Sequence, residues 1–99
     1  MNNLLKFIKI LCVRPALYIG SDKDIKLIRI HLSGYEQALL ETGNLEERHS
    51  LANFTTYLRL EAKSDDWWDK ILINMYGSEE GAIKNLPGKY NQFINVNNN

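Results

Sequence analysis

The sequence predicts an all-α protein, a compact single-domain bundle of four to six helices, and two observations carry this prediction. Apolar residues recur at intervals of three and four along most of the chain, which is the spacing of one face of a helix. Glycine, proline and short polar residues with helix-capping chemistry separate these segments. The period of two that is typical of a half-buried strand extends over no more than residues 17–19.

A length of 99 residues leaves room for one domain, which we expect to span residues 1–96, followed by a polar tail at residues 97–99. Twelve basic residues balance twelve acidic ones, so no net charge draws the chain to nucleic acid or to a membrane. No apolar run is long enough to span a bilayer. The single Cys12 cannot form an internal disulfide, and Lys6 and Lys9 interrupt any signal-like apolar segment. We therefore expect a cytoplasmic protein without a membrane partner.

The first two helices have clear boundaries in the sequence. The first begins at Asn2 or Asn3, ends before Pro15, and carries one apolar face, made of Leu4, Phe7, Ile8 and Leu11. After a compact connector at residues 16–20, the pair Ser21 and Asp24 starts a second helix at roughly residues 22–42. Its wide apolar face predicts that it is the central helix of the bundle. Gly34 inside it predicts a neighbour packed closely against the backbone.

The remaining helices follow the same kind of signals. The pair Asn44 and Glu47 predicts the start of a third helix, which runs to about Lys63. Residues 64–66 start a fourth helix that Gly77 ends, and residues 78–80 start a fifth. Pro87 must break or kink this last helix, because proline lacks an N–H group and clashes with the preceding turn. Residues 90–94 would then form a separate short amphipathic turn.

No set of residues points to catalysis or to metal or cofactor binding, so we expect no enzyme, no catalytic residue, no metal site and no cofactor. Cys12 lies among apolar residues, which favours a buried, inert thiol. His31 is interpreted as a core histidine bonded to a neighbour. Glu46 and His49 have the Glu-x-x-His spacing of di-iron bundles, but a single pair favours a solvated helix face.

The charges are unevenly distributed along the chain. Residues 1–31 carry a net charge of +4 and residues 32–69 carry −5. Either these parts pair within the bundle, or an acidic surface flanked by aromatic residues meets a basic partner. The candidate partner-binding residues of that surface are Glu61, Asp65, Asp66, Trp67, Trp68 and Asp69. Because adjacent residues of a helix point about 100° apart, a narrow stripe can bury one tryptophan only. We nevertheless expect both in the core, with exposure of one as the alternative.

Four short motifs, in this order, resemble small helical bacterial immunity proteins of polymorphic toxin and contact-dependent growth inhibition systems. They are Arg-Pro-x-x-Tyr-Ile-Gly at residues 14–20, Gly34-Tyr35 with Ala38, Trp67 with Ile71, and Ser78 with Ala82. The resemblance covers most of the chain, from Arg14 to Phe93, and departs at Pro87-Gly88. It implies a protein that binds a cognate toxin and blocks its active site or docking surface. It marks no binding residue. Many such toxins are nucleases with basic clefts, which an acidic inhibitor would complement.

The alternative hypothesis is a small regulatory or adaptor module that binds nucleic acid through its basic first third. That patch would consist of Lys6, Lys9, Arg14, Lys23, Lys26 and Arg29. The chain shows no helix-turn-helix signature, and the acidic middle opposes binding of phosphates. Toxin binding is therefore the favoured interpretation.

Overall fold

The computed structural model describes residues 2–21 and 23–97, and this part of the chain forms six helices. They are α1 (Asn3–Val13), α2 (Pro15–Ile19), α3 (Ile25–Glu41), α4 (Ser50–Ala62), α5 (Trp68–Tyr76) and α6 (Glu79–Asn97). The all-α prediction is confirmed. The expected connector at residues 16–20 is largely the short helix α2. Of the predicted tail at residues 97–99, Asn97 is the last residue of α6, and Asn98 and Asn99 lie outside the described residues.

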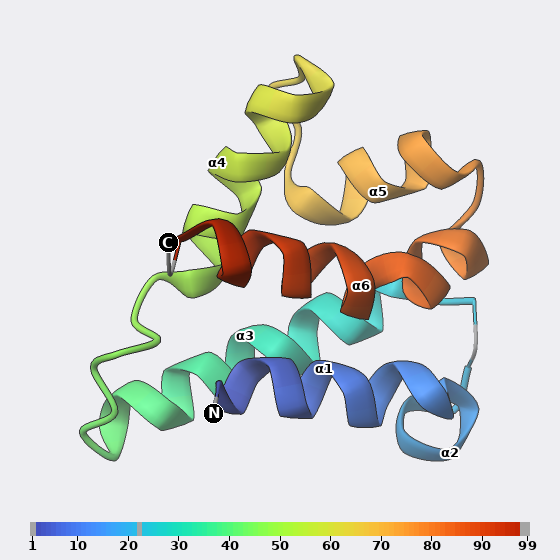
Figure 1. Cartoon of the computed structure of the whole chain (residues 1–99). Coiled ribbons are helices and arrows are strands. Elements are labelled where there is room, and N and C mark those ends of the chain that lie inside the picture. Colours follow the sequence, from blue (N-terminus) through green and yellow to red (C-terminus); the bar gives the residue numbers. More distant parts are fainter. Residues whose placement is uncertain (1, 22, 98–99) are drawn as a thin grey trace.

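The helices pack around α6, not around α3 as the sequence predicted. α6 contacts α1, α3, α4 and α5. In Figure 1, α6 runs through the middle of the molecule with α1 beside it, and α4 and α5 lie on the side of α6 away from α1. The apolar face of α3 is wide in sequence, but only Ile25, Ile28 and Leu32 are buried. Ala38 and His31 are exposed, and the Nδ1 atom of His31 lies 2.8 Å from the Leu27 carbonyl oxygen, so the expected core histidine is a surface residue.

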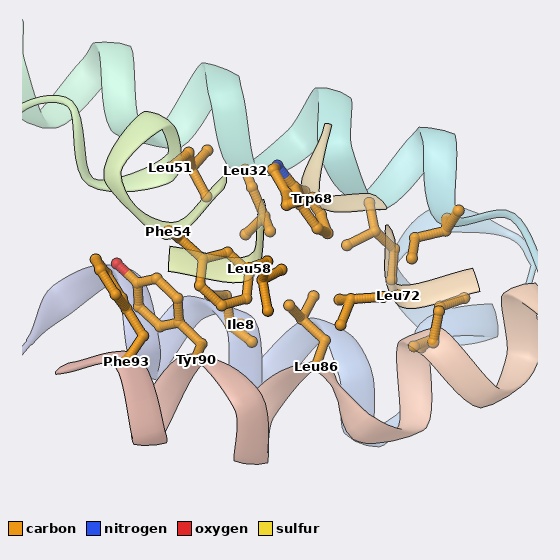
Figure 2. Close-up of a cluster of buried hydrophobic side chains, with 14 of the residues drawn as sticks. Ile8, Leu32, Leu51, Phe54, Leu58, Trp68, Leu72, Leu86, Tyr90 and Phe93 are labelled. Carbon is orange, nitrogen blue, oxygen red and sulfur yellow. The ribbon is translucent and has the colours of Figure 1, made fainter. Parts of the chain in front are cut away.

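One hydrophobic cluster joins the helices (Figure 2). Its aromatic part lies where α4, α5 and α6 meet. The ring of Phe54 packs edge-on against Tyr90 at a centroid distance of 5.1 Å, and its centroid lies 5.5 Å from that of Phe93 and 6.1 Å from that of Trp68. The hydroxyl groups of Tyr90 and Ser50 form a hydrogen bond. Burial raises the pKa of Tyr90 to about 12, despite that hydrogen bond, so the phenol stays protonated.

The predicted interruption of the last helix does not occur, because α6 runs through Pro87 from Glu79 to Asn97. Proline removes one backbone hydrogen bond and strains the turn before it, at a cost of about 3 kcal/mol. Apolar side chains on both sides of Pro87 are buried in the same core, namely Ala82, Ile83, Leu86, Tyr90 and Phe93. Since each large buried side chain contributes about 1.5–3 kcal/mol, their burial outweighs the loss at Pro87.

Carboxylates from distant parts of the chain cap three of the helices. Glu47 accepts hydrogen bonds from the backbone amides of Asn3 (3.1 Å) and Leu4 (2.6 Å) at the start of α1. Glu79 accepts one from the first amide of α3, and Glu36 accepts one from Leu51 near the start of α4. The prediction that Glu47 starts the third helix is therefore wrong, because its carboxylate caps α1 and α4 begins three residues later.

Gly34 lies on the exposed side of α3, and a Cβ atom added there would meet no atom within 4 Å. The closely packed neighbour expected from the sequence is absent at this residue. We expect Gly34→Ala to stabilise the protein by about 0.5–1 kcal/mol, because alanine restricts the unfolded chain more than glycine does. The measurement is urea unfolding followed by circular dichroism. Gly43→Ala is the opposite control. Gly43 has a φ of 89°, which alanine adopts only with strain, so this variant should be less stable than the wild type. A loss of stability in Gly34→Ala would contradict this assignment.

Candidate functional site

The structure separates the two adjacent tryptophans. Trp68 begins α5 and is only 1% exposed, whereas Trp67 precedes the helix in an extended conformation and is 54% exposed. The expectation that both are buried is therefore wrong, and the alternative of one exposed tryptophan is correct. Asp69, in the first turn of α5, is also buried. One of its carboxylate oxygens pairs with a guanidinium nitrogen of Arg29 at 3.2 Å. Because both side chains are buried, Trp68 and Asp69 cannot belong to an exposed acidic binding surface as the sequence predicted.

Glu61 is exposed, and it lines a different hollow from Trp67. Its carboxylate pairs with the ammonium group of Lys89 in α6 at 2.5 Å. Desolvation lowers the pKa of Lys89, but the hydrogen bond and the negative charge of Glu61 outweigh it, so the pKa is raised. Glu61 lines a hollow with Ile71 and Met75, and this hollow shares no lining residue with the groove that Trp67 lines. The negative charge of Glu61 is therefore balanced by Lys89 within the protein.

Arg59 holds the exposed indole of Trp67. The guanidinium carbon lies 5.7 Å from the centroid of the indole ring, which is the geometry of a cation–π contact. The Nε group of the same guanidinium donates a hydrogen bond of 2.9 Å to the backbone carbonyl of Asp66. The Asp66 amide in turn donates to the Ser64 hydroxyl at 3.1 Å. The loop before α5 therefore presents Trp67 as a fixed, half-exposed aromatic side chain with Asp65 exposed nearby in the chain.

An open groove lies between α3 and α4 and ends at the two tryptophans. α3 packs mainly against α1, α5 and α6, while α4 packs mainly against α5 and α6, and Glu36 of α3 accepts a hydrogen bond from the Leu51 amide of α4. The groove has a volume of about 440 Å³ and is lined by Arg29, Ser33, Glu36, Leu51, Ala52, Trp67 and Trp68. Figure 2 shows Trp68 reaching between α3 and α4 beside Leu32 and Leu51. A partner side chain inserted into this groove would meet Leu51, Ala52 and the two indoles, with Arg29, Ser33 and Glu36 as polar neighbours.

The charged groups that line the groove already have partners. Arg29 pairs with Asp69, and Glu36 accepts a hydrogen bond of 2.9 Å from the Leu51 amide. Both are therefore held in place at the rim of the groove. Sequence reasoning missed these lining residues. In the sequence, Arg29 counts as a member of the basic patch, and no local spacing indicates that α3 and α4 border a groove at this point.

The structure places neither the Glu46–His49 pair nor Cys12 in an arrangement typical of a metal site or of a reactive thiol. Glu46 and His49 lie in the turn before α4, so they do not share the helix face expected from their spacing. Burial raises the pKa of Cys12 to about 12, which keeps its thiol protonated at neutral pH. Within the part of the chain that the structure describes, no three His, Cys, Asp or Glu side chains come together as metal ligands. None of the described helices is both long and apolar enough to cross a membrane.

One of the six basic residues of the first third forms an ion pair in the described part of the chain, and the other five are exposed. Arg29 is turned toward Asp69, whereas Lys6, Lys9, Arg14, Lys23 and Lys26 are exposed on α1 and around the start of α3. Comparisons with protein-family models, with curated proteins and with solved structures each found no match to this chain. We define the Trp67 surface as Asp65, Asp66 and Trp67 together with the groove between α3 and α4.

Proposed function

We propose that this chain is an immunity-type inhibitor that binds and neutralises a cognate protein toxin through the Trp67 surface. The observation that carries the proposal is the half-exposed indole of Trp67, held by Arg59 at the end of an open groove. Tryptophan is a preferred anchor of protein interfaces, because it buries a large area with little loss of conformational freedom. A pre-positioned anchor also reduces the entropy lost on binding.

The charges of the Trp67 surface favour a basic partner. Asp65 is exposed and Asp66 is half-buried, and both directly precede the anchor. Carboxylates beside an anchor speed the encounter with a positively charged surface and disfavour acidic partners. A nuclease needs a basic cleft to hold phosphates, so its substrate cleft has the matching charge. The toxin in this proposal is therefore a nuclease whose cleft is covered by the Trp67 surface.

Affinity capture from a lysate of the protein's own host tests the function. We expect one stoichiometric protein that remains bound at high salt, is encoded beside this chain, and kills cells when it is expressed alone. Recovery of nucleic acid that modest salt releases would support the nucleic-acid alternative instead. Recovery of neither a lethal protein nor nucleic acid would also contradict the proposal.

With the captured toxin in hand, Trp67→Ala is expected to weaken binding by about 30-fold, which corresponds to about 2 kcal/mol for an interface anchor. Asp65→Lys is expected to slow association and to reverse its dependence on salt, while the dissociation rate changes little. Binding kinetics by biolayer interferometry measure both effects. Leu60→Ala is the matched control, because Leu60 is a 78% exposed apolar residue of α4 that does not line the groove and is not part of the Trp67 surface. Equal affinities of Trp67→Ala and Leu60→Ala would refute the proposed surface.

A further inference from the structure

A second group of exposed apolar side chains gathers where α1 meets α2. Val13 and Leu17 are 74% and 67% exposed, and Ile10 and Tyr18 are each about half exposed. Together with Lys9 and Arg14 they line an open hollow of about 390 Å³. We call these six residues the α1–α2 surface. Isolated exposed apolar residues are common, but four around one hollow are typical of an interaction site.

The α1–α2 surface is held in a fixed shape by the backbone. Only Arg14 separates the two helices, so α2 turns sharply off the end of α1. The Leu17 amide donates to the Arg14 carbonyl at 3.1 Å, and the Gly20 amide donates to the Ala16 carbonyl at 3.1 Å. Gly20 has a φ of 79°, which ends α2, and the neighbouring Ile19 packs against the core. The hollow therefore exists before any partner binds.

The charges around this hollow are positive. Lys9 and Arg14 are both exposed, and they take part in neither of the two ion pairs found among the described residues. Lys6 lies one helical turn before Ile10 and is exposed as well. The hollow is thus an apolar recess with a cationic rim. Such a rim attracts carboxylates and repels basic segments.

We propose that the α1–α2 surface binds an acidic amphipathic helix of a partner protein. The apolar face of that helix would enter the hollow between Val13 and Leu17, and its carboxylates would meet Lys9 and Arg14. Recognition of an amphipathic helix by an apolar groove is a recurring mode of peptide binding. The cationic rim selects an acidic helix over a basic one with the same apolar face.

Two other occupants fit the surface less well. A second copy related by two-fold symmetry would bring the cationic rim of one copy close to the cationic rim of the other, which is unfavourable. A bilayer surface is met best by protruding apolar side chains, as on an interfacial helix, whereas this surface is hollowed. The experiment that follows would detect either of these two occupants.

The inference is independent of the proposed toxin binding. The α1–α2 surface shares no residue with the Trp67 surface, and Figure 1 places α2 and the loop between α4 and α5 at different ends of the molecule. The two surfaces also select partners of opposite charge. Failure of either proposal therefore leaves the other standing.

The test uses the full chain and two synthetic helical peptides, each with leucine on one face. One peptide carries glutamate and the other lysine on the opposite face. We expect the glutamate peptide to shift the methyl resonances of Ile10, Val13 and Leu17 in NMR spectra, and to bind about tenfold more tightly than the lysine peptide. In the double variant Lys9→Glu/Arg14→Glu, the preference should reverse.

Val13→Asp is expected to weaken binding of the glutamate peptide by about tenfold, and Leu60→Asp, equally exposed but remote from the hollow, should leave it unchanged. Circular dichroism checks that each variant remains folded. Equal affinity for both peptides, or methyl shifts outside the α1–α2 surface, would overturn the proposal. So would binding to anionic phosphatidylserine vesicles without binding to either peptide, or a concentration-dependent dimer that Val13→Asp abolishes.

Discussion

Replacing Trp68 with alanine is expected to lower the free energy of unfolding by about 3–5 kcal/mol, whereas replacing its neighbour Trp67 should lower it by at most about 1 kcal/mol. Trp68 is 1% exposed and packs against Phe54, so its removal leaves a large cavity where α4, α5 and α6 meet. Trp67 is 54% exposed and makes a cation–π contact with Arg59 at the surface, so its removal leaves no enclosed cavity. The two substitutions remove the same side chain from adjacent positions.

Urea unfolding followed by far-UV circular dichroism measures both variants, since tryptophan fluorescence itself changes in each. Acrylamide quenching adds an independent readout. The emission left in the Trp68→Phe variant comes from Trp67 and should be quenched readily, and that left in Trp67→Phe comes from the buried Trp68 and should be protected. Similar losses of stability in the two alanine variants, or equal quenching, would mean that the two tryptophans are not placed as described.

Loss of the Glu47 carboxylate is the second large effect. Glu47 is buried and accepts hydrogen bonds from the amides of Asn3 and Leu4, more than forty residues away in the chain. Leu4 is fully buried, so water cannot replace the carboxylate at its amide. We expect Glu47→Ala to lower the free energy of unfolding by about 2–4 kcal/mol, because hydrogen bonds to charged groups each contribute about 1.5–3 kcal/mol.

Glu47→Gln should fall between the wild type and Glu47→Ala, since glutamine keeps one carbonyl oxygen as an acceptor but loses the charge that favours a helix N-terminus. Glu46→Ala is the matched control, because Glu46 is the exposed neighbour in the same turn and should change stability by no more than about 0.5 kcal/mol. If Glu47→Ala were as stable as Glu46→Ala, the capping of α1 by Glu47 would be contradicted.

The helical segments were predictable because their signals are local. Asn2 accepts a hydrogen bond from the amide three residues later, as an N-cap does, and Gly43 and Gly77 have the positive φ angles of helix ends. The N-cap of α3 is Asp24 and not Ser21, so this helix begins about three residues later than predicted. Glu47 could not be assigned in this way. Its spacing from Asn44 resembles a local capping pair, and its real partner is the start of a helix that only tertiary packing brings near.

The candidate site was predictable only in part. The sequence indicated residues 61–69 as a possible binding surface, but the rule that adjacent helical residues point about 100° apart did not apply to Trp67, which precedes α5. Asp69 and Glu61 were counted as surface charges, and each has an ion-pair partner on a different helix. Their partners follow from the packing of α3 and α6, which periodicity does not specify. The α1–α2 surface did have a sequence signal, because Ile10 and Val13 lie outside the buried stripe of α1.

Growth protection tests the central claim, that the Trp67 surface neutralises a toxin, most directly. Cells that express the captured toxin would also express the wild-type chain, Trp67→Ala or Leu60→Ala at equal levels of folded protein. We predict growth with the wild type and with Leu60→Ala, and loss of protection with Trp67→Ala when the toxin is in excess. Full protection by Trp67→Ala under the same conditions would show that the toxin is bound elsewhere and would contradict the account.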